Sequence, residues 1–171
     1  FGRMIADSRT AVAFTGHRTY RGAAADALRR TVGELYARGF RNFLSGMAVG
    51  FDLAAAEAVL ELRERAPGVR LVAAVPFRGQ EMRFSPADRE RFRRVLAEAD
   101  SVEVLAPAYH RGCYAVRNDF LVYNARVLVA WYDGSPGGTR HTVSRALRRG
   151  LEFVNLHPQR AGVALTEPTL F

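Results

Sequence analysis

The chain has 171 residues, of which 49% are hydrophobic, and this size and composition fit one globular domain. Its single cysteine, Cys113, excludes an internal disulfide bond and favours a reducing compartment. No apolar run is long enough to span a bilayer and the amino terminus has no signal-peptide pattern, so we expect a cytoplasmic protein without a membrane partner. Phe1–Arg3 precede Met4, and we leave them out of the fold prediction.

The formal net charge of +8 has two interpretations. Clustered arginines bind the phosphates of nucleic acids, and all 25 basic residues are arginine. Many of these arginines, however, stand beside glutamates on predicted helix faces, as in segments 61–65 and 89–91, which is typical of a solvated surface. We therefore keep a nucleic-acid partner as the less favoured alternative.

Apolar runs of strand length alternate with segments of helical periodicity along nearly the whole chain. The predicted strands are 11–14, 40–44, 71–75, 102–105, 127–131 and 153–156. Between them, apolar residues recur every three or four positions, which predicts amphipathic helices around 28–36, 92–99 and 143–147. Gly39 and Gly150 are expected to end two helices, and Pro67-Gly68 a third.

This alternation predicts one α/β domain of Rossmann-like build over residues 4–158, followed by a C-terminal tail at 159–171. Its sheet should be open and mostly parallel, with helices on both faces. In such sheets ligands bind beyond the carboxyl ends of the strands. Functional residues are therefore expected directly after each strand.

Three small-residue loops follow three of the predicted strands. The first consists of Thr15, Gly16, His17 and Arg18, in which the glycine permits a tight turn and the hydroxyl, imidazole and guanidinium can contact an anion. The second is Ser45–Asp52, whose small residues let backbone amides approach a ligand at the start of a helix that Asp52 is predicted to cap. The third contains Gly137, Gly138 and Thr139, an expected anion nest at another helix start.

Each loop alone is also compatible with an ordinary turn, and the chain contains neither the GxGxxG fingerprint nor a GxxxxGK[ST] phosphate loop. Their occurrence after three different strands predicts one phosphate site at one edge of the sheet. The predicted ligand-binding residues are Gly16, His17, Arg18, Ser45, Gly46, Met47, Gly50, Asp52, Gln80, Arg117, Asn118, Gly137, Gly138 and Thr139. Arg18 and Arg117 would neutralise phosphate, and Gln80 and Asn118 would orient the ligand.

The order of these segments resembles the YpsA-like family of the SLOG superfamily of Rossmann-like proteins. The matching segments lie between about Val12 and Leu156, and they are 15–18, 45–52, 76–77, 80–81, 117–118, 133–134 and 137–139. The resemblance implies a Rossmann-like fold and a protein that binds a nucleotide or nucleotide-derived ligand, such as NAD or an ADP-ribose derivative, as a sensor or effector. It implies no particular reaction. Phe84 and Tyr123-Asn124 depart from the family pattern, where tryptophan and an acidic residue are expected.

Two related groups supply alternative functions. Segment 45–52 and Arg117-Asn118 are also similar to the DNA-processing protein DprA, which binds single-stranded DNA, and Tyr109, Tyr114 and Phe120 are the aromatic residues available for stacking. The Gly137-Gly138-Thr139 loop is similar to that of LOG-type phosphoribohydrolases. Residues 140–143 lack the catalytic glutamates of that group, so cleavage of that kind is not expected.

For a nucleotide-processing enzyme, Glu81 and His17 are the candidate acid or base, although both are also compatible with a structural role. The four histidines lack the spacing of a metal site, and we predict no metal. Cys113 carries no signal of an activated nucleophile. Neither the oligomeric state nor the identity of the ligand is predicted.

Overall fold

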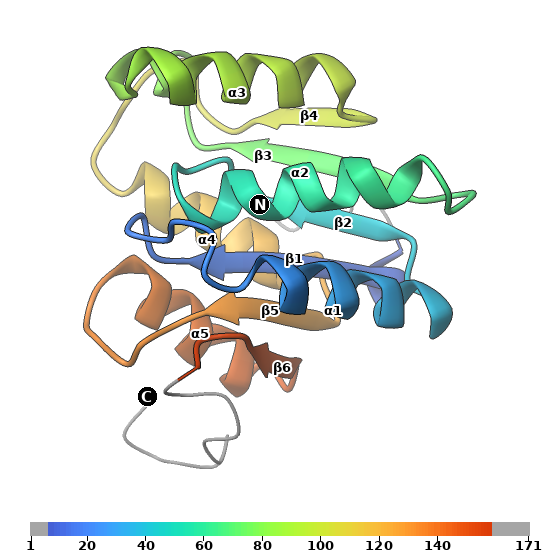
Figure 1. Cartoon of the computed structure of the whole chain (residues 1–171). Coiled ribbons are helices and arrows are strands. Elements are labelled where there is room, and N and C mark those ends of the chain that lie inside the picture. Colours follow the sequence, from blue (N-terminus) through green and yellow to red (C-terminus); the bar gives the residue numbers. More distant parts are fainter. Residues whose placement is uncertain (1–6, 159–171) are drawn as a thin grey trace.

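The computed structural model describes residues 7–158, so residues 1–6, which include the first three of the predicted domain, and the predicted tail 159–171 lie outside the described residues. Six strands form one sheet in the order β4-β3-β2-β1-β5-β6, and every neighbouring pair is parallel (Figure 1). The strands are β1 (Ala11–Gly16), β2 (Asn42–Ser45), β3 (Arg70–Val75), β4 (Ser101–Val104), β5 (Val127–Trp131) and β6 (Glu152–Asn155). The predicted α/β fold of Rossmann-like build is therefore confirmed.

Helices connect consecutive strands and cover both faces of the sheet (Figure 1). The helices are α1 (Ala25–Ala37), α2 (Phe51–Arg63), α3 (Pro86–Glu98), α4 (Cys113–Tyr123) and α5 (Gly138–Arg148), with short 3-10 turns η1 (Ser8–Thr10) and η2 (Gln80–Arg83). Helices α1, α2 and α3 pack in one apolar cluster on one face, and α4 and α5 pack in another on the opposite face. None of the helices in residues 7–158 is long and apolar enough to cross a membrane.

The central strands are apolar on both sides because each side is covered. In β1, Val12 and Phe14 pack with the cluster of α1, α2 and α3, whereas Ala11 and Ala13 pack with that of α4 and α5. In the edge strand β4, every second residue is exposed, and the exposed residues are Val102 and Val104. Burial on both faces accounts for the continuous apolar sequences of the central strands.

The helix ends follow the sequence signals at two of three positions. Gly39 and Gly150 adopt φ angles of 104° and 82° just after α1 and α5, a conformation that favours glycine. Helix α2, in contrast, ends at Arg63, before the Pro67-Gly68 signal. Strand β5 has the predicted limits, and those of the other five strands differ from the predicted ones by one or two residues, because hydrogen bonding to the neighbouring strand sets them.

The strand order creates a switch point beside β1. From β1 the chain proceeds through β2 and β3 to the edge strand β4, and it then returns to place β5 on the other side of β1. The connections that leave β1 and β5 therefore depart toward opposite faces of the sheet. A crevice opens between such connections at the carboxyl edge, which is where open α/β sheets bind ligands.

Candidate functional site

A cavity of about 440 Å³ lies at this switch point, and we call it the switch-point cavity. It brings together residues that follow β1, β2 and β5 and one side of α4. The lining residues are Thr15, Gly16, His17, Arg18, Ala48, Asp52, Tyr114, Arg117, Asn118, Leu121, Gly138 and Thr139. The two loops predicted to converge, Ser45–Asp52 and Gly137–Thr139, thus both contribute to one concave site.

Two glycines let the loops after β1 and β2 approach each other. A Cβ atom on Gly16 would lie 2.4 Å from Cβ of Phe51, the first residue of α2. Gly50 has a φ angle of 83°, and a Cβ atom there would lie 2.7 Å from the backbone carbonyl oxygens of His17 and Arg18. No larger side chain fits either position without movement of the backbone. Gly50 therefore shapes the site from outside the cavity lining.

The loop after β2 is organised by buried polar contacts. The Ser45 hydroxyl donates to the Asp52 carbonyl at 2.9 Å and accepts from the Met47 amide at 3.2 Å. Met47 adopts a φ angle of 65° and is fully buried in the core, so its side chain does not face the cavity. The prediction that Asp52 caps α2 is wrong, because Gly50 occupies the cap position and Asp52 Oδ2 accepts from the Ala48 amide in the preceding loop.

Asp52 is the unusual group of the cavity. Its side chain is buried, and Oδ1 has no hydrogen-bond partner among the described residues. Burial raises the pKa of the Asp52 carboxyl from 3.8 to about 6, against the opposing effects of Arg117, the Ala48 amide and Arg18. A buried acceptor without a partner is costly, so Asp52 is poised to accept a hydrogen bond from a group that enters the cavity.

Arg117 places a fixed cation opposite this carboxylate. Its guanidinium donates from Nη1 to the Gly46 carbonyl and from Nε to Asn118 Oδ1 at 2.9 Å. A Cβ atom on Gly46 would lie 2.8 Å from Cδ of Arg117, so the glycine makes room for the side chain. Burial lowers the pKa of the Arg117 guanidinium, and the negative charge of Asp52 opposes that shift. Gly46 thus acts on the cavity through Arg117.

A second arginine gives the cavity an excess of positive charge. Arg18 is exposed at the rim, and its Cζ lies 5.7 Å from the ring centroid of Tyr114. Cζ of Arg117 lies at the same distance from that ring. Two guanidinium groups therefore share one aromatic ring and face a single carboxylate, Asp52. This imbalance favours an anionic ligand.

The start of α5 leaves open space beside these charges. Gly137 precedes the helix with a φ angle of 136°, and a Cβ atom there would meet no heavy atom within 4 Å. At Gly138 a Cβ atom would meet only Asn118 Nδ2, at 3.9 Å. The first amides of an 11-residue helix carry partial positive charge toward this space.

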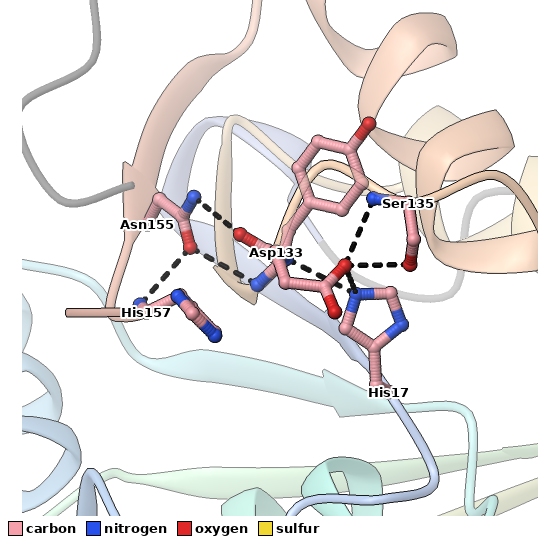
Figure 2. Close-up of polar contacts among 6 residues, drawn as sticks. His17, Asp133, Ser135, Asn155 and His157 are labelled. Carbon is pink, nitrogen blue, oxygen red and sulfur yellow. Dashed lines mark hydrogen bonds and ion pairs between the residues drawn. The ribbon is translucent and has the colours of Figure 1, made fainter. Parts of the chain in front are cut away.

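His17 closes the cavity on the side of β5 through the contacts shown in Figure 2. Its Nε2 lies 2.8 Å from Asp133 Oδ1 and 3.1 Å from the Asp133 amide nitrogen. When Nε2 carries a proton it donates to Oδ1, and when Nε2 carries none it accepts from the amide, so one of these two contacts is made in each case. The pKa of the Asp133 carboxyl is lowered, mainly by the hydrogen bonds that Ser135 donates to it.

Six predicted residues lie outside the lining of the switch-point cavity, and they are Ser45, Gly46, Met47, Gly50, Gln80 and Gly137. Gln80 lines a smaller adjoining recess instead. Glu81 also lies outside the cavity lining, and its Oε2 is 3.9 Å from Arg93 Nε. Phe120 packs in the core and is not available for stacking. Among residues 7–158 no group of three His, Cys, Asp or Glu side chains is arranged to hold a metal.

The sequence indicated Thr15 only as a hydroxyl of the first loop and Tyr114 only as a stacking residue, and it did not single out Ala48 or Leu121, although all four line the cavity. Thr15 and Ala48 stand next to predicted residues, so the loops themselves were the available signal. Tyr114 and Leu121 lie on the same helix as Arg117, spaced by three and four positions from it. Helical periodicity around Arg117 would have placed them on its face.

Comparisons with known proteins agree with this architecture. Residues 13–152 match the family YpsA, described as the YspA SLOG family, and the chain belongs to this family. Among its relatives, a UPF0398 protein of Bacillus thuringiensis strain Al Hakam is 28% identical over 134 residues, which cover 77% of this chain and 72% of the relative. A UPF0398 protein of Bacillus cereus strain G9842 is 27% identical over 139 residues, covering 80% and 75%.

Two solved structures share the fold. DprA from Streptococcus pneumoniae superposes with a TM-score of 0.62 at 19% identity, covering 85% of this chain and 49% of that protein. DprA from Helicobacter pylori, described in its single-stranded DNA binding mode, superposes with a TM-score of 0.63 at 18% identity, covering 87% and 66%. The chain thus spans about half the length of the first DprA, and the likeness establishes the fold.

Proposed function

We propose that the protein binds a nucleotide or nucleotide-derived phosphate ligand in the switch-point cavity and acts as a sensor or effector. One observation carries this proposal: two guanidinium groups, Arg18 and Arg117, face a single buried carboxylate, Asp52, inside a cavity of about 440 Å³. That volume lies in the range of small-molecule sites. The excess positive charge selects an anion, and phosphate suits the forked guanidinium group.

Two features support a nucleotide in preference to a bare phosphate ion. The buried Asp52 Oδ1 lacks a partner among the described residues, and a ribose hydroxyl can donate to it, as ribose hydroxyls do to acidic residues in other Rossmann-like sites. Gly138 leaves room at the start of α5 for a phosphate beside Arg117. A ligand with a phosphate and a sugar hydroxyl, such as AMP, NAD or ADP-ribose, satisfies both features.

We propose binding of a ligand at this site, and no reaction. Glu81 does not line the cavity, and its carboxylate lies near Arg93. His17 does line the cavity, but Nε2 is engaged by Asp133. A general base must reach the proton that it abstracts, and only His17 of the two candidates stands at the cavity.

The first experiment is native mass spectrometry of the purified chain with a panel of AMP, NAD and ADP-ribose, followed by calorimetric titration of each nucleotide that binds. Gly138→Asp should lower the affinity at least tenfold, because it places a carboxylate where phosphate is expected, in space that tolerates a side chain. Gly33→Asp is the matched control, since position 33 is also open but lies on α1. Equal nucleotide affinity for both variants would contradict the proposal.

Binding of single-stranded DNA is the second candidate, and the DprA structures provide its specific support. The Helicobacter pylori protein, which has the same fold, is described as binding single-stranded DNA. This chain also presents Tyr109, 50% exposed, with Arg83 Cζ 4.6 Å from its ring centroid, as a surface on which a base can stack. Tight, salt-sensitive binding of a deoxyoligonucleotide together with no binding of any nucleotide would favour this candidate.

A further inference from the structure

A second, smaller hollow of about 210 Å³ opens next to the switch-point cavity, and we call it the Gln80 recess. Three of its lining residues, Arg18, Ala48 and Tyr114, also line the switch-point cavity, so the two hollows are contiguous. The opposite wall of the recess comes from η2 and the residues after it, including Gln80 and Arg83.

Gln80 is buried at this wall without a complete set of partners. Its side chain is only 3% exposed, and its Oε1 has no hydrogen-bond partner among the described residues. Buried amide oxygens are normally satisfied, so an orphan one that lines a hollow marks a place where a donor can bind. This observation is independent of the phosphate-binding features of the neighbouring cavity.

The other walls of the recess suit a flat, aromatic group. The Tyr114 ring stands between the two hollows and lies 6.0 Å from the Phe77 ring and 6.3 Å from the Tyr109 ring, centroid to centroid. Arg83 adds a planar guanidinium at the outer wall. Aromatic rings and guanidinium planes are the surfaces on which nucleobases stack.

The segment that carries Gln80 is held in place by backbone contacts. Arg89 of α3 donates from Nη2 to the Phe84 carbonyl at 3.2 Å and from Nε to the Glu81 carbonyl at 3.4 Å. The amide of Gln80 itself donates to the Phe77 carbonyl at 3.3 Å. The side-chain amide is therefore presented to the recess by a fixed backbone, as recognition of one particular group requires.

We propose that the Gln80 recess binds the nucleobase of the ligand, with the Gln80 amide hydrogen-bonded to the edge of the base and the Tyr114 ring against its face. This inference rests on the proposed function, since the phosphate of the same ligand lies in the switch-point cavity. A carboxamide offers a donor and an acceptor side by side, which matches the amino group and adjacent ring nitrogen on one edge of adenine or of cytosine. Adenine has the larger face to stack on the Tyr114 ring, so adenine nucleotides are the expected class.

Calorimetric titration with AMP, ribose 5-phosphate and CMP separates the contributions of base and phosphate. The unaltered chain should bind AMP about tenfold more tightly than ribose 5-phosphate, and CMP should lie between them. Gln80→Met keeps the length of the side chain and removes its polar atoms, so it should lower the preference for AMP severalfold, to what stacking on Tyr114 contributes, while ribose 5-phosphate affinity stays within about twofold. Retained binding of ribose 5-phosphate also reports that the variant is folded.

A second variant at position 80 and a control at position 81 test the same inference. Gln80→Glu keeps the size of the side chain and should also lower the AMP preference, so it tests the inference if the methionine variant fails to fold. Glu81→Gln is the matched control, because residue 81 is the neighbour of Gln80 but lines neither hollow. It should leave both affinities unchanged.

The outcomes distinguish the two levels of the proposal. If the unaltered chain binds AMP and ribose 5-phosphate equally, or if a folded Gln80 variant keeps the full AMP preference, the base-binding role is overturned while the phosphate site stands. If the unaltered chain binds none of the three probes, the proposed function falls, and the base-binding role falls with it.

Discussion

Two cavities of nearly the same size differ sharply in how their charges are balanced. The helix-side cavity, about 430 Å³ between α1, α2 and α3, is lined by three arginines and three carboxylates, which are Arg21, Arg29, Arg91, Glu57, Glu61 and Asp88. Arg91 pairs with Glu57 at 2.6 Å and with Asp88 at 3.0 Å, and Arg29 pairs with Glu61 at 3.4 Å. Its charges are neutralised within the protein.

In the switch-point cavity, about 440 Å³, the positive and negative side chains do not balance. Arg18 and Arg117 face one buried carboxylate, and Asp52 Oδ1 is left without a partner among the described residues. Volume therefore does not separate the two cavities, whereas unmatched charge and an unsatisfied buried atom do. This difference supports the proposal that a ligand binds in the switch-point cavity and not in the helix-side cavity.

The largest expected effect comes from Gly50, the residue that stands between the two cavities. It lines the helix-side cavity, and a Cβ atom on it would meet the backbone carbonyls of His17 and Arg18 at 2.7 Å. Gly50 also has a φ angle of 83°, which alanine rarely adopts. Gly50→Ala should therefore lower the free energy of unfolding by about 3 kcal/mol or more. Urea denaturation measures this loss.

Gly33→Ala provides the control for Gly50→Ala. Position 33 lies inside α1 with no heavy atom within 4 Å of an added Cβ, so alanine there should raise the free energy of unfolding by about 0.5–1 kcal/mol. A loss of similar size in both variants would mean that close approach of the two loops does not explain the requirement for glycine at position 50.

The sequence predicted the layout of the site because local patterns determine it. Continuous apolar strands and small-residue loops at their ends have local causes, so the parallel sheet and the converging loops 45–52 and 137–139 could be predicted. Arg18 lines the cavity because it follows β1, a strand of the switch point. Arg117 and Asn118 also line it, but they lie on α4, and the family resemblance was the signal that indicated them.

The sequence could not predict which side chain of a loop faces the cavity. Met47 lies between Gly46 and Ala48, but it has a positive φ angle and is buried in the core. The contact of Asp52 with the Ala48 amide depends on the path of the loop, and the burial that raises the pKa of Asp52 depends on tertiary packing. Glu81 and Gln80 are neighbours, yet only Gln80 lines a hollow.

The next effect in size concerns stability and pH, and it follows from the raised pKa of Asp52. The folded-state pKa is about 6 and the unfolded value is 3.8, so the folded state binds the proton more tightly and the buried charge costs stability as pH rises from about 4 to above 6. Between pH 8 and pH 5 the unaltered chain should gain about 1–2 kcal/mol relative to Asp52→Asn. Urea denaturation of both proteins at the two pH values measures this difference.

Asp100→Asn supplies the control. Burial opposes the shift, but the Leu71 amide and Arg63 lower the pKa of the Asp100 carboxyl, so the unaltered chain should gain no stability at pH 5 relative to this variant. If Asp52→Asn and the unaltered chain respond identically to pH, the carboxylate of Asp52 is not buried as an uncompensated charge, and the contrast between the cavities weakens.

Arg18→Ala tests the excess charge without disturbing the core. Arg18 is exposed at the rim, so we expect little change in the free energy of unfolding, in contrast to replacement of the buried Arg117. Affinity for ADP-ribose, whose phosphates stay ionised between pH 5 and pH 8, should fall about tenfold, as is usual for loss of one charge-assisted contact. Calorimetry at constant salt measures the change. Undiminished affinity would mean that Arg18 is not part of the phosphate site.

The smallest expected effect is that of Arg29→Ala, which removes an arginine from the helix-side cavity. Arg29 is half-exposed and lies beside Asp26 and Glu61, so its loss should leave the affinity for ADP-ribose within about twofold of the unaltered chain. The same variant also separates the two candidate functions, because a long single strand sums many phosphate contacts over the surface and its binding weakens steeply with salt. Titration with ADP-ribose and with a deoxyoligonucleotide at two salt concentrations makes the comparison. If Arg29→Ala weakens oligonucleotide binding as much as Arg18→Ala does, and neither affects a nucleotide, the two cavities are parts of one extended nucleic-acid surface and the contrast between them no longer supports a small ligand.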